Sequence, residues 1–416
     1  MKNRCLRIVL LLILSLILGL GWWVPSATAD TENQKLVAEV WRIVNQSYVD
    51  ETFNHQNWWL VRQKALKQYI KNREETYSVI GKMLASLDDP FTRHLQPSQY
   101  RNLQVSTSGE LTGVGLQIAL DEETGVLQVV TPIAGSPAQK AGIKPGDRIL
   151  KIDGVSTTEF TLDEAAAQMR GPMGSQVVLT VAGRESETQE VTLVRDRIAL
   201  NPVIAQLRSS PGSVPVGYIR LNQFNGNAVA EVAHAISGLE KQGADAYILD
   251  LRNNPGGLLQ AGIEIARFWL DRGTIVYTVN RQGIIGSFEA TNAALTNDPL
   301  VVLVNRGTAS ASEILAGALQ DNQRAQIVGE KTFGKGLIQS LFDLSDGSGL
   351  AVTVAKYETP NHHDINKLGI TPDRLISWEP TAFDQVATEV DQQYKTALEI
   401  LTNTSVVANA PLGDRG

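Results

Sequence analysis

The second half of the chain alternates apolar runs with amphipathic stretches, and this alternation restricts the possible folds more than any other feature. Strands are expected at 216–221, 246–251, 275–278 and 300–304, and helices at 258–270, at 311–319 and around Val229, Val232, Ala233 and Ile236. Strands separated by helices pair in parallel and are covered by those helices. We therefore predict a largely parallel, buried sheet with a functional site at the carboxyl ends of its strands.

Two loops leave such strand ends, one at 252–257 (Arg-Asn-Asn-Pro-Gly-Gly) and one at 305–313. Ser310, in the second loop, stands where a strand turns into a helix, so its hydroxyl lies near the positive end of the helix dipole. This position suits a serine nucleophile, because it stabilises an alkoxide. On this motif alone, an ordinary helix N-cap, for which serine is a preferred residue, would be the more common explanation.

A serine nucleophile needs a base. His362 and His363 follow in sequence, but they lie in a proline-containing loop with no pattern that orients an imidazole. Lys335, flanked by Gly334 and Gly336, is the better candidate, because the glycines allow close packing around the amine. It can act only if burial lowers its pKa from about 10.4 towards neutrality. A surface loop lysine is the alternative interpretation.

The segment 329–336 also imitates a phosphate-binding loop. It matches G-x-x-x-x-G-K, but Gly336 replaces the Ser or Thr that would hold magnesium. The following residues, 337–342, have the pattern of a strand, whereas a phosphate-binding loop is followed by a helix. We reject a nucleotide site.

Between the N-terminal region and these strands, the sequence changes to short strands and turns. Ser-Pro-Ala at 136–138 and Gly-Ile-Lys-Pro-Gly-Asp-Arg-Ile-Leu-Lys-Ile-Asp-Gly at 142–154 resemble a PDZ domain, and the resemblance covers 107–197. Such domains add an incoming peptide as an extra strand and capture its carboxylate with backbone N–H groups. Val114, Gly115 and Leu116 match the carboxylate loop, so the expected partners are C-terminal tails of proteins.

The first residues have the composition of an export signal. Lys2, Arg4 and Arg7 precede an apolar run at 8–20, and Ala27-Thr28-Ala29 is a small-x-small cleavage pattern. The run is shorter than the roughly 20 residues that span a bilayer, so we expect cleavage after Ala29 rather than a membrane anchor. The sole cysteine, Cys5, would be removed, which excludes a thiol nucleophile in the mature chain.

Charge and cysteine content exclude other classes of function. The chain carries 37 Lys and Arg against 44 Asp and Glu, a net charge of −7, which becomes −10 when the three basic residues of the signal are lost. No broad basic surface is available for a nucleic acid backbone. With one cysteine, neither a disulfide nor a cysteine-built metal site is possible.

Several motifs together resemble the carboxyl-terminal processing (tail-specific) peptidases. These are Thr-Ala-Ser-Ala-Ser-Glu-Ile at 308–314, Gln-Asp at 320–321 and the segment 329–339. Members of this family are secreted serine proteases with a Ser–Lys dyad and an inserted PDZ domain, and the resemblance spans nearly the whole mature chain. It implies that Ser310, rather than its rival Ser312, is the nucleophile and that Lys335 is the general base.

The same resemblance implies further site residues. Asp321 and Gln339 match supporting positions that hold the lysine or the active arrangement. The backbone N–H groups of Gly256 and Ala311 match the oxyanion hole. Arg170 lies where some relatives carry an arginine that links the bound peptide to assembly of the active site. No metal or other cofactor is implied.

The N-terminal motifs at 53–59, 73–77 and 86–93 are similar to those of the family's members in oxygenic phototrophs. Those enzymes remove the C-terminal extension of the photosystem II reaction-centre protein precursor. The resemblance thus implies a monomeric endopeptidase of the thylakoid lumen or periplasm. The alternatives are a general tail-specific quality-control protease, an inactive PDZ adaptor that only binds tails, and an acyl-CoA enzyme with a crotonase-type fold.

The predicted architecture is a multidomain α/β chain. Its parts are a signal peptide (1–29), an N-terminal helical region (30–106), a β-rich PDZ domain with short helices (107–197), a crotonase- and ClpP-like βα catalytic domain (198–380), and a C-terminal helix with a polar tail (381–416).

Overall fold

The computed structural model describes residues 32–121, 125–183, 188–208, 214–377 and 385–408. The predicted signal peptide lies outside these residues. Within the described ranges, no helix has the length and apolar character needed to cross a membrane.

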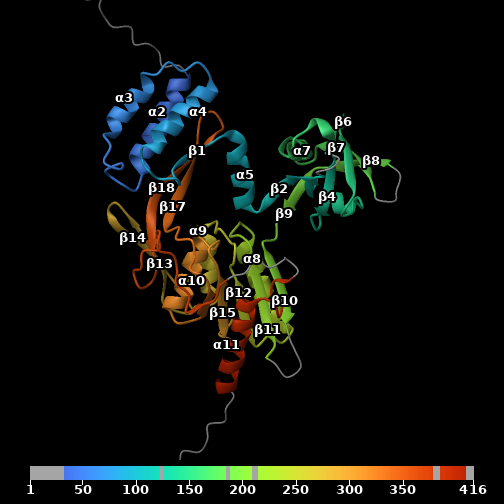
Figure 1. Ribbon diagram of the computed structural model, residues 1–416, viewed down its shortest axis with the longest axis vertical. Coiled ribbons are helices and arrows are strands. Elements are labelled where there is room, and N and C mark those ends of the chain that lie inside the picture. The colour runs from blue at the N-terminus through green and yellow to red at the C-terminus, as the bar shows by residue number, and fades with distance from the viewer. Residues whose placement is uncertain (1–31, 122–124, 184–187, 209–213, 378–384, 409–416) are drawn as a thin grey trace, which may run out of the picture.

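The predicted parallel sheet is the centre of the predicted catalytic domain (Figure 1). Its strand order is β10-β11-β12-β15-β16-β19, and only β10 runs antiparallel to its neighbour. The bounds of its strands are β10 Val203–Arg208, β11 Val216–Leu221, β12 Ala246–Asp250, β15 Leu300–Val304, β16 Gln326–Gly329 and β19 Arg374–Leu375. Every residue of β12 and β15 is buried, which explains why these strands are continuously apolar.

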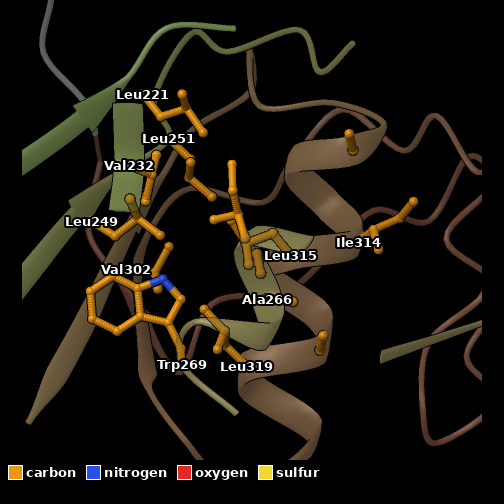
Figure 2. Close-up of a cluster of buried hydrophobic side chains, with 14 of the residues drawn as sticks. Leu221, Val232, Leu249, Leu251, Ala266, Trp269, Val302, Ile314, Leu315 and Leu319 are labelled. Atoms are coloured by element: carbon orange, nitrogen blue, oxygen red, sulfur yellow. The ribbon is translucent and has the colours of Figure 1, made fainter. Parts of the chain in front are cut away.

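Helices cover both faces of this sheet. They are α8 (Ala228–Lys241), α9 (Leu259–Arg267), α10 (Ala311–Asp321) and α11 (Gln392–Ala408). The first three share one apolar cluster with the sheet, and α11 packs in a second cluster on its other side. Figure 2 shows part of the first cluster, in which Leu249, Val302 and Leu315 are fully buried. Burying each such side chain stabilises the fold by about 1.5–3 kcal/mol.

A second, antiparallel sheet stands next to the first. Its order is β1-β18-β13-β14, and β17 also pairs with β18. The bounds are β1 Arg93–Leu95, β13 Thr274–Asn280, β14 Gly283–Glu289, β17 Leu337–Asp343 and β18 Gly349–Glu358. The expected strand at 275–278 therefore exists, but its expected place in the parallel series was wrong. Since only two residues separate β13 from β14, the connection is a hairpin, and a hairpin makes its strands antiparallel.

The N-terminal region is helical, as expected, and packs on this second sheet. Its helices are α2 (Glu32–Ser47), α3 (Trp58–Leu66), α4 (Arg73–Ala85) and α5 (Pro97–Ser108). Leu36, Val40 and Ile80 share a buried cluster with Leu350 and Val352 of β18. The helix expected from 57 to 71 ends at Leu66. Beyond it, Ile70 still packs on the cluster, but the Tyr69 side chain is 85% exposed.

The PDZ region forms its own sheet and core. The sheet order is β3-β4-β5-β7-β8, with β6 on β5. The bounds are β3 Leu116–Leu120, β4 Leu127–Pro132, α6 Pro137–Lys140, β5 Arg148–Ile152, β6 Val155–Ser156, α7 Leu162–Met169, β7 Gln176–Ala182 and β8 Thr188–Val194. A two-stranded ribbon of β2 (Glu110–Gly113) and β9 (Asp196–Ala199) joins this region to the rest of the chain (Figure 1).

Candidate active site

Ser310 occupies a sharp turn between β15 and α10. Its backbone has φ 59° and ψ −120°, a conformation that costs a non-glycine residue roughly 1–3 kcal/mol. The surrounding loop holds this geometry: the Ala309 N–H donates to the Asn254 carbonyl (3.0 Å), and the Thr308 hydroxyl donates to the Leu251 carbonyl (2.8 Å). A strained strand-to-helix turn is a common way to present a nucleophilic serine at the top of a sheet.

Ser312, the rival nucleophile, is fully buried. Its hydroxyl donates to the Asn254 carbonyl at 3.0 Å. Ser310, in contrast, is partly exposed and lines a cleft. The geometry therefore favours Ser310, as the family resemblance does.

Glu313 links the two halves of the site, although the sequence analysis gave it no role. Its carboxylate is fully buried and accepts hydrogen bonds from the backbone N–H of Ser310 (2.8 Å), Gly334 (2.7 Å) and Lys335 (2.9 Å). It also accepts the Thr332 hydroxyl. One side chain at the start of α10 thus fixes the backbone of both predicted dyad residues.

The Lys335 side chain is partly buried and lies over the ring of Phe91, with Nζ 5.0 Å from the ring centroid. Among the described residues, Nζ makes no hydrogen bond or ion pair, with Ser310 or with any other group. Burial, reinforced by the positive charge of Arg93, lowers the pKa of Lys335 below its ordinary value, against the opposing effects of Glu313 and Asp89. A lowered pKa is what a lysine base requires.

Ser310 and Lys335 line the same cleft, which has a volume of about 330 Å³. Other residues that line it are Phe91, Arg93, Gln223, Gly256, Ala311, Ile338, Gln339 and Tyr357. The cleft therefore combines a nucleophile, an amine and apolar walls in a space where a peptide bond could react.

The predicted oxyanion donors lie beside Ser310. Gly256 has φ 94°, and a Cβ there would lie 2.8 Å from the Ser310 Cβ and 2.9 Å from the Ala311 nitrogen, so only glycine fits. The Ala311 N–H has no acceptor among the described residues, whereas the Gly256 N–H donates to the Asn254 side chain at 2.9 Å. In this structure, one of the two expected donors is already engaged.

The two expected supporting residues, Gln339 and Asp321, lie in different places. Gln339 lines the cleft with Lys335, and its buried side-chain nitrogen has no hydrogen-bond partner among the described residues. Asp321 ends α10, ten residues or about 15 Å from Ala311, and accepts the backbone N–H of Asn361. It does not line the cleft, because the length of α10 carries it away from Ser310. Its supporting role stays a prediction.

The predicted tail-binding residues lie where β2 gives way to β3. Val114 is buried in the PDZ core. Gly115 has φ 77°, and a Cβ there would lie 2.3 Å from that of Ser136, so the loop requires glycine. Leu116 begins β3. Arg170 follows α7 and donates to the side chain of Asn102 in α5 at 2.9 Å, so it connects the PDZ region to the helical region rather than entering the cleft.

Three residues that line the cleft, Phe91, Arg93 and Tyr357, were not predicted as site residues from the sequence. Phe91 and Arg93 belong to a motif that served only to compare subfamilies. Tyr357, whose hydroxyl lies 2.9 Å from Ser310 Oγ, sits in a strand with no distinguishing pattern. Only the pairing of β18 with β13 and β17 brings Tyr357 to the site.

No arrangement of three or more His, Cys, Asp or Glu side chains suited to a metal occurs in the described ranges.

The fold and site define a serine hydrolase of peptide bonds with a PDZ domain, and comparisons with known proteins agree. The profile of peptidase family S41 matches residues 215–376, and that of the PDZ domain matches residues 128–183. The carboxyl-terminal-processing protease of Synechocystis sp. is 63% identical over 386 residues, covering 92% of this chain and 90% of that protein. Carboxyl-terminal-processing peptidase 2 of Arabidopsis thaliana chloroplasts is 49% identical, covering 89% and 74% respectively.

Among solved structures, the photosystem II D1 C-terminal processing protease is 45% identical and superposes with a TM-score of 0.56, covering 86% of this chain and 96% of that one. The chain belongs to peptidase family S41 and is a C-terminal processing peptidase. This confirms the predicted enzyme class and sets aside the adaptor and acyl-CoA alternatives.

Proposed function

We propose that the chain is an exported serine endopeptidase that removes the C-terminal extension of the photosystem II reaction-centre protein precursor, with Ser310 as nucleophile and Lys335 as general base. The observation that carries the dyad is the single cleft lined by both residues, whose backbones share the Glu313 carboxylate. The substrate is suggested by the likeness to the photosystem II D1 processing protease.

In the proposed reaction, the neutral Lys335 amine accepts the proton of the Ser310 hydroxyl while Oγ bonds to the carbonyl carbon of the scissile peptide. The carbonyl oxygen becomes an oxyanion, and the Ala311 N–H, which has no acceptor among the described residues, is the proposed donor to it. Lys335 then gives the proton to the departing amine as the C–N bond breaks, which leaves an acyl-enzyme. Water repeats the sequence: its proton passes to Lys335 and then to Oγ, which leaves as the hydroxyl.

The PDZ domain is proposed to capture the free carboxylate of the substrate tail at Val114, Gly115 and Leu116 and so to deliver the chain to the cleft. Arg170, through its bond to Asn102, is placed to relay that binding to α5. We place the mature enzyme in the thylakoid lumen or periplasm, as a monomer.

The dyad is tested with Ser310→Ala and Lys335→Ala, using Lys331→Ala, an exposed lysine of the same loop, as the matched control. We expect both dyad variants to lose cleavage by at least about 10³-fold while their unfolding midpoints stay near that of the wild type. The control should cleave normally. A fluorophosphonate probe should label the wild type at Ser310, and full cleavage by either dyad variant would disprove the assignment.

The substrate is tested by mass spectrometry of products from the precursor tail and from an unrelated apolar tail. Faster cleavage of the precursor tail at one bond supports the specific role, and equal cleavage supports a general tail protease. Amidating the tail should raise KM by about tenfold or more without changing kcat, because it removes the carboxylate that the PDZ loop binds.

A further inference from the structure

Tyr357 lies against the predicted nucleophile, Ser310, from the second sheet. It stands in β18, its side chain is 2% exposed, and its hydroxyl lies 2.9 Å from Ser310 Oγ. Its backbone N–H donates to the Gly336 carbonyl (3.1 Å), immediately after Lys335. One residue of the second sheet is thus held by its backbone beside the base and by its side chain beside the nucleophile.

The phenol is suited to donate a hydrogen bond. Burial, reinforced by the nearby Glu313 carboxylate and opposed by the bond to Ser310, raises the pKa of Tyr357 above its ordinary value, so the group stays protonated. Its hydroxyl has no other partner among the described residues. When Tyr357 donates to Oγ, the proton of Ser310 is free to turn towards an amine.

We propose that Tyr357 is a catalytic residue that donates a hydrogen bond to Ser310 Oγ and stabilises the negative charge on that oxygen as its proton passes to Lys335 and again when the acyl group leaves. Tyr357 keeps its own proton throughout; the O–H bond of Ser310 breaks, and the electron pair stays on Oγ. This inference rests on the proposed dyad.

A purely structural role would predict something different. Tyr247 is also fully buried in this core, and its hydroxyl has no hydrogen-bond partner among the described residues. A buried phenol is therefore tolerated here without a partner, and the Tyr357 contact is not required to satisfy packing. Tyr247→Phe is the matched control, since it removes the same hydroxyl from the same cluster away from the cleft.

The test compares Tyr357→Phe, Tyr247→Phe and Ser310→Ala in kcat, KM and the rate of labelling by a fluorophosphonate. We expect Tyr357→Phe to lower kcat and the labelling rate by the same factor, about 10- to 100-fold, with KM unchanged. Tyr247→Phe should match the wild type. Turnover and labelling of Tyr357→Phe within twofold of the wild type would overturn the inference. Activity in Ser310→Ala would instead refute the nucleophile itself.

A second variant keeps the test valid if Tyr357→Phe misfolds. Difluorotyrosine placed at 357 preserves shape and hydroxyl but makes the phenol more acidic. The charge of Glu313, from α10, acts on the phenol, and Lys335 and Arg93 line the same cleft as Tyr357. Because the donor must be protonated, the alkaline limb of the kcat profile should move to lower pH. A limb that does not move would overturn the inference.

Discussion

The two halves of the predicted dyad are held in very different ways. The backbone of Ser310 has little conformational freedom. It is strained, it is flanked by the hydrogen bonds of Thr308 and Ala309, and it leads into the buried start of α10. The Lys335 backbone is equally fixed, through Glu313, but its ammonium has no polar partner among the described residues and rests on Phe91. The contrast therefore lies in the side chains: the Ser310 hydroxyl has a hydrogen-bond partner in Tyr357, at 2.9 Å, and the Lys335 amine has none among the described residues.

This difference separates two tasks of the fold. The parallel sheet and α10 build the nucleophile from neighbours within the catalytic domain. The environment that lowers the pKa of the lysine comes partly from Phe91 and Arg93, which belong to the N-terminal region. The N-terminal region therefore acts on the Lys335 amine, whereas the hydrogen bonds of Ser310 among the described residues are made with Glu313, Ile314 and Tyr357 of the predicted catalytic domain. Predictions that affect one half and spare the other test this division.

The largest effect is expected at Glu313, which binds the backbone of both Ser310 and Lys335. Glu313→Gln replaces a carboxylate that accepts three backbone N–H groups with an amide that has one acceptor oxygen. We expect a loss of about 2–4 kcal/mol in the free energy of unfolding and at least a 100-fold loss of kcat. Urea unfolding and steady-state kinetics measure the two quantities.

Glu164→Gln is the matched control, because Glu164 has the same capping position at the start of α7, where it is exposed and bonds Thr161. We expect it to destabilise the fold much less than Glu313→Gln does and to leave kcat unchanged. Equal effects of the two substitutions would mean that Glu313 is only a helix cap.

The second prediction concerns the stability cost of the base. Lys335→Met is expected to abolish activity. At neutral pH it is also expected to raise the free energy of unfolding by about 0.5–2 kcal/mol. Since the pKa is lower in the folded chain, the unfolded chain binds more protons between the folded and ordinary pKa values, and wild-type stability rises with pH across that window. The advantage of the variant should shrink as pH approaches 10.5.

Lys331→Met, in the exposed part of the same loop, should give no such pH-dependent difference. If Lys335→Met were destabilised at pH 7, the buried ammonium would be contributing to stability, and the contrast between the two halves would be wrong.

The sequence predicted those parts of the site that depend on local pattern. Ser310 follows an apolar strand and precedes an amphipathic helix, so its position could be inferred from periodicity. Lys335 and Gln339 came from a motif. Tyr357 could not be predicted, since it reaches the site through the pairing of β18 with β17 and with β13, where its partner Thr278 lies about 80 residues earlier. Asp321 also came from a motif, but a motif does not specify how far along a helix a residue lies, and Asp321 ends α10 outside the cleft.

The topology was predictable to the same extent. Parallel pairing follows from helices between strands, and β11, β12 and β15 obey it. The strand at 275–278 was assigned to the wrong sheet because its helical spacing from β12 resembled another βα unit, and the decisive feature was the short turn that follows it. Turns of two residues deserve weight over the spacing of strands.

The smallest effect tests the link from the N-terminal region to the base. Arg93→Met removes a positive charge that, together with burial, lowers the pKa of Lys335. The pKa should rise, so the acid limb of the kcat/KM profile should move to higher pH. Because Arg93 is exposed, the loss of activity at pH 7 should be only about 2- to 5-fold, and added salt should reduce the difference between variant and wild type.

Arg101→Met serves as the control, because Arg101 is an exposed arginine of α5 that does not line the cleft. Its profile should coincide with that of the wild type, and both variants should react with the fluorophosphonate at the plateau rate at high pH, where the amine is neutral in either case. An unchanged acid limb in Arg93→Met would show that burial, without the charge of Arg93, lowers the pKa of Lys335. The N-terminal region would then affect the base only through the contact with Phe91.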